Sequence, residues 1–347
     1  YLIILIILAC TQLTGCSYFP QIEDFSKVTS GEASQEAKVL ENELQQMREE
    51  VADYFYYQQL DTDEERRVYL QLANGLRTFK QQITIDRVDD ETYTRAFFSV
   101  ANDFPEYYWM TDAMRDGIDY QDLSEPDYPL QVEEESKKIA TLAQSIVSQA
   151  PKDHVYDTVK FFYEYIIQHT DYNLAALSDS QISWDNQSIK SVLLDNSSVC
   201  AGYSRTFQYL CKLAGIEAVY VTGNVAGTNG ETIEHAWNLV KIDQQYYGVD
   251  STWGEPVFEE AMGSQAQSTI SYDYLCVPDS ILYRNRVADV DLLSYWGTEY
   301  PYTERPLVYP SCTDNALNYY VQQGTYFENF DEELVVQTVS NLYQAGQ

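Results

Sequence analysis

Hydrophobic side chains recur every three or four positions over several stretches of the chain, which is the spacing of an amphipathic helix. This spacing begins at residue 36 and is carried by Leu40, Leu44, Met47 and Val51. The same period predicts further helices over residues 64–80, 133–149, 154–170 and 331–342. Pro151 follows one of these segments and ends it. The N-terminal part of the chain is therefore expected to be mainly helical.

Three stretches within this part break the helical pattern. Residues 82–85 and 94–100 are rich in β-branched and aromatic side chains, a composition that predicts two short strands. Residues 103–109 hold Pro105 among aromatic side chains and predict a loop with rings packed beneath it.

The central part of the chain predicts one helix followed by strands. Ser197 and Ser198 favour a helix N-cap, and Gly215 favours a helix stop. Between them, apolar positions at helical spacing are Tyr203, Phe207, Leu210, Cys211 and Ala214. A strand over 217–222 and a loop over 223–230 follow. Residues 235–242 and 245–250 predict two strands that form a hairpin around Asp243 and Gln244.

Cys200, His235 and Asp250 lie at the ends of these predicted elements. Cys200 falls in the first turn of the helix, where free backbone N–H groups and the positive end of the dipole stabilise a thiolate. His235 begins one strand and Asp250 ends the other, so both lie at the open end of the hairpin. A two-residue turn makes them diagonal neighbours on one face, with backbones about 7–8 Å apart. A three-residue turn would place them on opposite faces.

These three residue types form a thiol-based catalytic triad, in which histidine moves the proton and aspartate orients the imidazole. Each residue alone also has an ordinary structural explanation, as a small core residue, a buried polar group or a turn residue. Their order and placement favour the triad. Gln187 is a weaker candidate for an oxyanion donor, because a helix cap or a surface amide explains it more simply. We interpret His154 and His169 as structural or surface residues and Cys211 as a buried, inert thiol.

The N-terminus predicts export and lipid anchoring. Residues 2–9 are apolar but too few to span a bilayer, which needs roughly 20 residues. The sequence Leu13, Thr14, Gly15, Cys16 is typical of a bacterial lipobox, so Cys16 is the expected lipidation site. Residues 1–16 would be the signal peptide and 17–35 a flexible tether, which places the protein on the extracytoplasmic face of the cell membrane. An ordinary secretory signal with a chance cysteine is the alternative.

Composition and charge limit which partners and cofactors the protein can have. The 347 residues include 31 tyrosines and carry a net charge of -33, which excludes a nucleic-acid partner because such binding needs clustered Lys and Arg. Neither a Cys-x-x-Cys pair nor an Asp-x-Asp-x-Asp-Gly loop occurs, so we expect neither a metal nor another cofactor. Cys276 and Cys312 could form a disulfide, but their spacing alone does not decide whether they do.

The sequence around the three candidates resembles the bacterial transglutaminase-like superfamily. The matching segments are Val-Cys-Ala-Gly-Tyr-Ser at 199–204, His-Ala-Trp-Asn at 235–238 and Asp-Ser-Thr-Trp at 250–253. The resemblance implies a papain-like α+β fold with the cysteine-bearing helix packed on an antiparallel sheet. It implies Cys200 as nucleophile, His235 as base and Asp250 as its orienting partner. It also implies that Trp237 and Trp253 form walls of the cleft, where they could serve packing or substrate binding.

The periodicity and the resemblance together suggest how the chain is organised, whereas the resemblance does not fix the reaction. Residues 36–150 would form a mainly helical N-terminal region, 151–280 the catalytic core and 281–347 a C-terminal extension. The expected activity is acyl transfer from a protein or peptide amide at the cell envelope, through a Cys200 thioester, to an amine or water. A cysteine peptidase or amidase of the same fold is one alternative. A catalytically silent cell-surface binding module is another.

Overall fold

The computed structural model describes residues 30–80, 83–110, 128–177, 179–226, 232–255, 270–292, 305–329 and 331–345. The chain divides into two compact units, residues 1–45 and 46–347. Helix α2 (Ser30–Glu50) confirms the helix predicted from residue 36. The lipobox and Cys16 lie outside the described residues. Within the described ranges, every helix is too short or too polar to cross a membrane.

Helices dominate the N-terminal part of the second unit, and they include the three segments where the periodicity predicts them, residues 64–80, 133–149 and 154–170. They are α3 (Phe55–Gln58), α4 (Asp63–Arg77), α5 (Asp90–Asp103), α7 (Tyr128–Gln149) and α8 (Val155–His169). Helix α4 begins at a capping box, in which Thr62 accepts the Glu65 N–H while the Glu65 side chain accepts the Thr62 N–H. The loop after α5 buries the aromatic side chains expected there, Phe104, Tyr107, Tyr108 and Trp109.

The strand predicted over residues 94–100 is wrong, because this segment lies inside α5. Asp89 starts that helix by accepting the Thr92 N–H at 2.8 Å, and α5 then packs against α4. Burial against a neighbouring helix thus outweighs the strand preference of the aromatic and β-branched side chains. The strand predicted at 82–85 is also wrong, since residues 83–85 are irregular and Gln82 lies outside the described residues.

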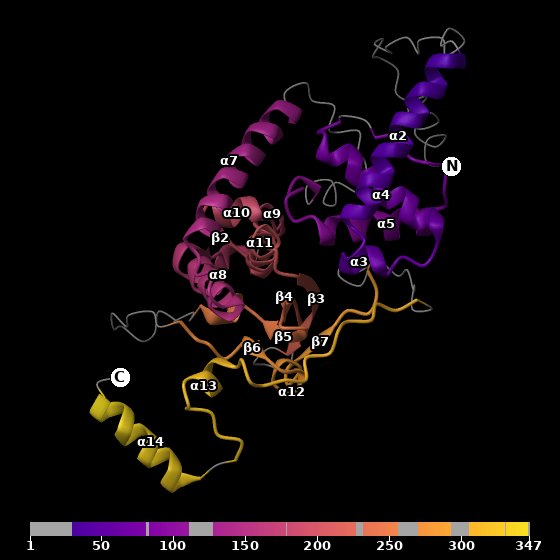
Figure 1. Ribbon diagram of the computed structural model, residues 1–347. Coiled ribbons are helices and arrows are strands. Elements are labelled where there is room, and N and C mark those ends of the chain that lie inside the picture. The colour runs from indigo at the N-terminus through magenta and orange to yellow at the C-terminus, as the bar shows by residue number, and fades with distance from the viewer. Residues whose placement is uncertain are drawn as a thin grey trace. The chain divides into compact units, whose positions relative to one another are not determined.

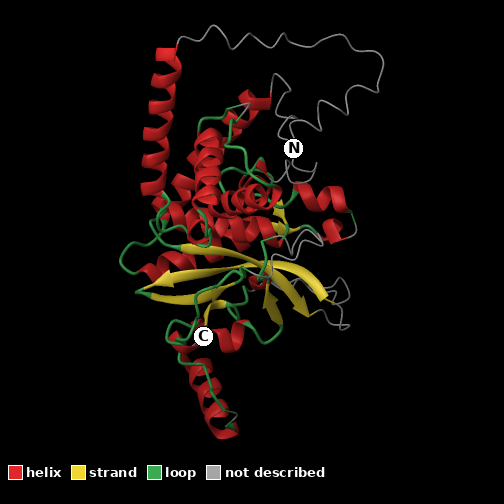
Figure 2. Ribbon diagram, turned by 90° about the vertical axis from the view of Figure 1, so that its right-hand side faces the viewer, coloured by secondary structure: helices red, strands yellow, loops and turns green. Residues whose placement is uncertain are grey.

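A five-stranded antiparallel sheet forms the other layer of the second unit, in the order β6-β5-β4-β3-β7 (Figure 2). Its strands are β3 (Ala218–Ala226), β4 (Thr232–Ile242), β5 (Gln245–Val249), β6 (Leu275–Val277) and β7 (Arg286–Ala288). β3 runs further than the strand predicted at 217–222. β7 lies beyond residue 280, the limit that the sequence analysis gives to the catalytic core.

The β4–β5 hairpin has the predicted two-residue turn. Asp243 and Gln244 both have positive φ, 48° and 67°, as in the tight turns that suit the twist of a hairpin. The register pairs Ile242 with Gln245 and Asn238 with Val249. Asp250 therefore follows the last paired residue at the open end of the hairpin, where His235 also lies.

Helix α11 (Cys200–Leu213) packs on β3 and β4, and Figure 1 shows it with α8 on the same face of the sheet. It ends before Gly215, whose φ of 73° confirms the predicted stop. The predicted serine caps are wrong: Ser197 and Ser198 form β2 (Ser197–Ser198), which pairs in parallel with β1 (Asp171–Tyr172). This architecture confirms the α+β fold expected from the resemblance.

Seven further helices complete the described part of the chain. They are the 3₁₀ helices η4 (Leu174–Leu177) and η5 (Thr252–Gly254) and the α-helices α9 (Ser180–Asp185), α10 (Ile189–Leu193), α12 (Asp279–Leu282), α13 (Tyr319–Gln322) and α14 (Glu332–Ala345). Helix α14 confirms the helix predicted at 331–342. The four described cysteines, Cys276 and Cys312 among them, are free thiols.

Candidate active site

Cys200 is the first residue of α11, and its side chain is 8% exposed. The residue before it, Val199, is the N-cap and has an extended backbone without a side-chain cap bond. The N–H groups of a first helical turn have no partner within the helix. They remain available to stabilise negative charge on the sulfur or on a substrate oxygen.

The segment around Asn186 holds the start of α11 in place. The Asn186 carbonyl accepts the Val199 N–H at 3.2 Å and the Ser198 hydroxyl at 2.8 Å. This packing requires a glycine at position 202, where a Cβ would lie 1.9 Å from the Ser198 hydroxyl oxygen and 3.0 Å from the carbonyl oxygens of Asn186 and Ser188. Gln187 lies between these two residues and is buried.

His235 and Asp250 meet directly. His235 Nε2 lies 2.7 Å from Asp250 Oδ2, and both side chains are buried. The other carboxylate oxygen, Oδ1, accepts the Trp253 N–H at 3.2 Å. The diagonal contact predicted from a two-residue turn is therefore present, and it leaves the Nδ1 side of the imidazole for Cys200.

Electrostatics favour a charged imidazole at this point. Burial lowers the pKa of His235, but the Asp250 carboxylate and the neighbouring Cys200 outweigh burial and raise that pKa well above its ordinary value. Burial likewise opposes ionisation of Asp250, but His235 and Arg286 lower its pKa. An imidazolium next to a cysteine stabilises the thiolate, which is the reactive form of the sulfur.

Arg286 is a member of this cluster that the sequence analysis missed. It lies on β7, 36 residues after Asp250, and its Nη1 atom donates to Asp250 Oδ2 at 2.5 Å. Both side chains of this ion pair are completely buried. Nothing in the local sequence marks this arginine, because only the strand order brings β7 to the site.

Aromatic rings enclose the cluster. The ring of His235 lies 6.1 Å from that of Trp237 and 6.0 Å from that of Trp253. Trp237 is fully buried and packs in the core, whereas Trp253 is 36% exposed. Of the two tryptophans expected to wall a cleft, only Trp253 therefore reaches the surface.

The other residues interpreted as structural lie away from this cluster. Cys211 is fully buried near the far end of α11, and burial raises the pKa of its thiol well above the usual value. His154 and His169 are exposed at opposite ends of α8. No group of three or more His, Cys, Asp or Glu side chains in the described ranges is arranged to hold a metal ion.

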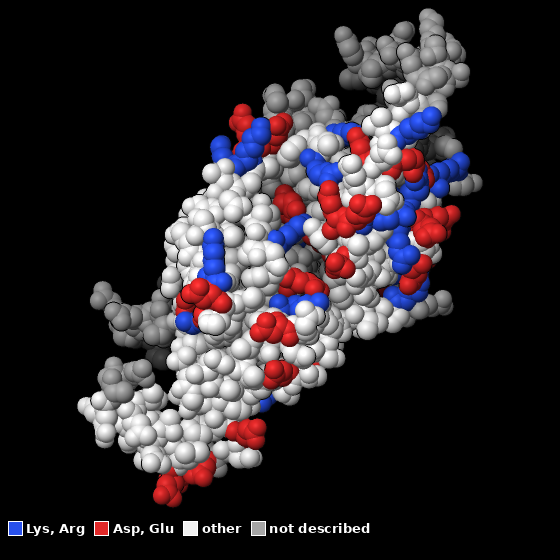
Figure 3. Space-filling model, in the orientation of Figure 1, with Lys and Arg blue, Asp and Glu red and all other residues white. Residues whose placement is uncertain are grey.

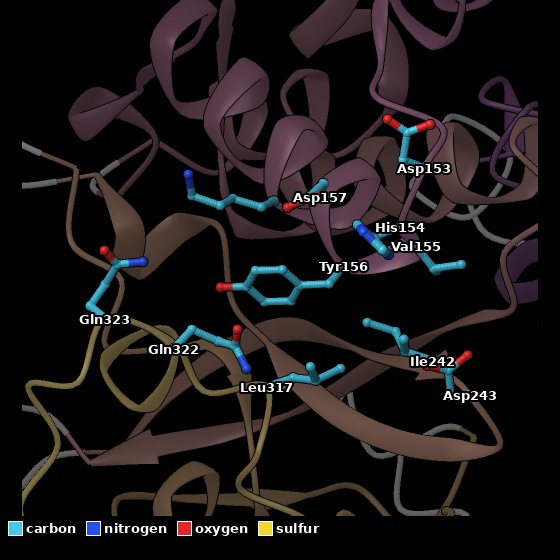
Figure 4. Close-up of a pocket in the computed structure, with 11 residues that line it drawn as sticks. Asp153, His154, Val155, Tyr156, Asp157, Ile242, Asp243, Leu317, Gln322 and Gln323 are labelled. Atoms are coloured by element: carbon cyan, nitrogen blue, oxygen red, sulfur yellow. The ribbon is translucent and has the colours of Figure 1, made fainter.

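A cavity of about 570 Å³ lies at the opposite end of the β4–β5 hairpin (Figure 4). Its lining includes His154 and Tyr156 from the start of α8, Asp243 from the hairpin turn, and Gln322 and Gln323. The triad residues do not line it: His235 and Asp250 lie at the open end of the same hairpin, and Cys200 lies at the start of α11. We therefore assign this cavity no part in the chemistry of Cys200.

Comparison with known proteins agrees with this arrangement. Residues 140–251 match the model of the transglutaminase-like superfamily, a range that contains all three candidate residues. Kyphoscoliosis peptidase of Homo sapiens is 28% identical over 159 residues, which cover 43% of this chain and 23% of that protein. Kyphoscoliosis peptidase of Mus musculus is 29% identical over 122 residues, 33% of this chain and 18% of that protein. The chain thus spans less than a quarter of either relative.

Among solved structures, a transglutaminase crystal structure aligns with a TM-score of 0.32 and 20% identity, over 46% of this chain and 42% of that one. The family match over residues 140–251 coincides with the helix and sheet that carry Cys200, His235 and Asp250. Residues 140–251 of the chain are therefore a transglutaminase-like domain.

Proposed function

We propose that the protein is a thiol acyltransferase or hydrolase that attacks an amide carbonyl through Cys200. The observation that carries this proposal is the contact of His235 with Asp250 at 2.7 Å, beside a cysteine in the first turn of a helix. This combination supplies a nucleophile, a proton carrier and an orienting carboxylate.

In the first half of the reaction, the Cys200 thiolate attacks the amide carbon and a carbon–sulfur bond forms. The N–H groups of the first turn of α11 stabilise the oxyanion. The imidazolium of His235 then gives its proton to the leaving nitrogen, and the carbon–nitrogen bond breaks. The product is a thioester on Cys200 and a free amine or ammonia.

In the second half, an amine or a water molecule attacks the thioester. His235 takes a proton from this nucleophile, the carbon–sulfur bond breaks, and the thiolate returns with its imidazolium partner. An amine acceptor gives a cross-link, and water gives hydrolysis. The relatives named peptidase favour cleavage of a peptide bond as the second candidate activity.

We further propose that the enzyme is lipid-anchored through Cys16 at the extracytoplasmic face of the membrane and acts on proteins or peptides of the cell envelope. The lipobox-like residues before Cys16 support the anchor. The charge supports a protein substrate over nucleic acid: on the face in Figure 3, the Lys and Arg side chains of the described residues lie among Asp and Glu. Replacing Cys16→Ala should abolish incorporation of a labelled fatty acid during expression in bacteria.

The activity is tested with Cys200→Ala and a matched control, Cys211→Ala, which removes a thiol from the same helix. Glutamine-containing peptides are supplied with a fluorescent primary amine, while amine incorporation, ammonia release and peptide cleavage are followed together. We expect Cys211→Ala to keep the activity and Cys200→Ala to lose it. Equal activity in both variants, or none of the three products with the parent protein, would contradict the proposal.

A further inference from the structure

The Asp250 carboxylate serves two cations through one oxygen. Oδ2 lies 2.7 Å from His235 Nε2 and 2.5 Å from Arg286 Nη1. The triad described above needs only the first of these contacts. The second brings a permanent charge to the same atom, because arginine keeps its proton at any pH that the fold survives.

The guanidinium is held rigidly in this place. β7 pairs with β3, with Val225 opposite Arg286. The Arg286 side chain is fully buried, and its Nε donates to Asn285 Oδ1 at 3.3 Å. Its central carbon lies 4.4 Å from the ring centre of Tyr274, 5.1 Å from that of Trp253 and 5.3 Å from that of Trp237. Such packing on aromatic faces fixes both the position and the orientation of the charge.

This arrangement bears on proton transfer. A buried carboxylate that faced His235 alone would hold the imidazolium proton strongly, because charges interact strongly in a medium of low polarity. A proton held too strongly is transferred poorly to a leaving group. The positive charge of Arg286 offsets part of the negative charge that His235 meets.

We propose that Arg286 is a positioning residue of the site: it fixes the Asp250 carboxylate opposite His235 and limits how strongly that carboxylate holds the imidazolium proton. The catalytic meaning of this role rests on the proposed function, whereas the electrostatic coupling itself does not. Arg286 makes no contact with Cys200 in the described structure and acts only through Asp250.

Other titratable groups surround the pair but do not change charge near neutral pH. Tyr163 and Tyr172 interact electrostatically with Asp250, and Tyr283 interacts with Arg286. Burial raises the pKa of all three phenols above their ordinary value. Tyr274 faces the guanidinium with its ring. Cys200 is the remaining ionisable neighbour of His235, so the test removes it.

The test is an NMR titration of histidine with ¹⁵N-labelled protein in a Cys200→Ala background. The chain has three histidines, and the exposed His154 and His169 serve as internal references. Arg286→Met removes the charge, Arg286→Gln removes the charge but keeps a hydrogen-bond donor, and Arg286→Lys keeps the charge. Arg95→Met is the matched control, since Arg95 is equally buried in an ion pair with Glu65, 3.0 Å away and outside the site.

We expect both neutral variants to raise the pKa of His235 by about one unit, in line with the loss of a nearby cation. Arg286→Lys and Arg95→Met should leave that pKa within a few tenths of the parent. A second measurement uses the Cys200→Ala chain with Arg286 intact: the Arg286 guanidinium resonances should shift with the same midpoint as the His235 ring.

An unchanged or lowered pKa of His235 in Arg286→Gln or Arg286→Met would overturn the proposal. If neither variant folds, the proposal would be overturned by Arg286 guanidinium resonances whose chemical shifts stay constant while His235 titrates. Because Cys200 is absent throughout, an inactive enzyme leaves this result unaffected, and loss of the proposed function is recognised separately by the amine-incorporation assay.

Discussion

Asp250 and Asp103 are two buried carboxylates of the same chain, 0% and 6% exposed, and their surroundings act in opposite directions. Asp250 faces two cationic groups, which lower its pKa. Asp103, at the end of α5, accepts hydrogen bonds from the Tyr56 and Tyr57 N–H groups at 3.1 and 2.9 Å and from the Tyr69 hydroxyl at 2.8 Å. Burial outweighs these bonds and raises the pKa of Asp103 to about 7.

The difference shows that burial and full hydrogen bonding do not by themselves keep a carboxylate ionised. Lys212 lowers the pKa of Asp103 only in part, because its ammonium group pairs with Glu106 at 2.7 Å. Neutral donors therefore suffice to fix the helical region, whereas the candidate active site needs fixed positive charge to keep a permanent anion beside His235.

The largest expected effect comes from Asp250→Asn compared with Asp103→Asn. Asp250→Asn leaves the buried Arg286 charge unpaired and the imidazole without its orienting anion. We expect it to lower the free energy of unfolding by about 3–5 kcal/mol and the activity of Cys200 by roughly 10³–10⁴-fold. Asp103→Asn should cost only about 1–3 kcal/mol, for a lost hydrogen bond, and spare the activity. Urea unfolding and the amine-incorporation assay measure both; equal effects would break the comparison.

The pH dependence of stability separates the same two carboxylates. Because folding raises the pKa of Asp103, the folded state binds more protons from about pH 4 to about pH 7, and stability from this group is lost as pH rises through that range. Asp250, whose pKa folding lowers, stabilises the folded state above about pH 4, and this stabilisation is lost as the pH falls toward 2. Asp103→Asn should therefore remove a decline of roughly 2–4 kcal/mol between pH 4 and 7 in urea titrations. The same decline in both proteins would contradict the assignment.

A double replacement measures how strongly the Asp250 and Arg286 charges depend on each other. Asp250→Asn leaves the buried Arg286 charge without a partner and Arg286→Met leaves Asp250 with His235 alone, whereas the double variant removes both charges of the pair. The double variant should therefore lose less stability than the sum of the single losses, by about 0.5–3 kcal/mol. Additive losses in urea unfolding would show that the two charges do not depend on each other.

The smallest effects are expected at the exposed histidines. His154→Ala and His169→Ala should change the free energy of unfolding by less than about 0.5 kcal/mol. Neither should alter the rate at which Cys200 reacts with iodoacetamide. A large effect of either on that rate would mean that His235 is not the histidine that serves the thiol.

Local patterns predict the parts of the fold that short-range forces determine. Helical spacing gives α4 and α8, and the paired residues of the two-residue turn give the register that sets His235 beside Asp250. The segment at 94–100 is different, since its helix depends on contacts with α4 that no local pattern contains. The role of Arg286 is harder still to predict, because its three-residue strand is brought to the site only by the strand order of the sheet.

Serines 197 and 198 show a related limit. Their side chains suit a helix cap, but pairing with β1 and the bond from the Ser198 hydroxyl to the Asn186 carbonyl use them otherwise. Long-range pairing thus replaces a local preference worth about 1 kcal/mol. The prediction that Cys200 lies in the first turn of α11 is nevertheless correct, because the extended residue Val199 serves as the N-cap.

The central claim is that Cys200 reacts as a thiolate paired with the His235 imidazolium. The direct measurement is the rate of alkylation of Cys200 by iodoacetamide from pH 5 to 10, followed by mass spectrometry of the peptide that contains it, in the parent protein and in His235→Ala. We expect rapid alkylation already at mildly acidic pH in the parent and a slower, alkaline-shifted reaction in the variant. A parent protein that reacts no faster than a free thiol, with the same profile as His235→Ala, would contradict it.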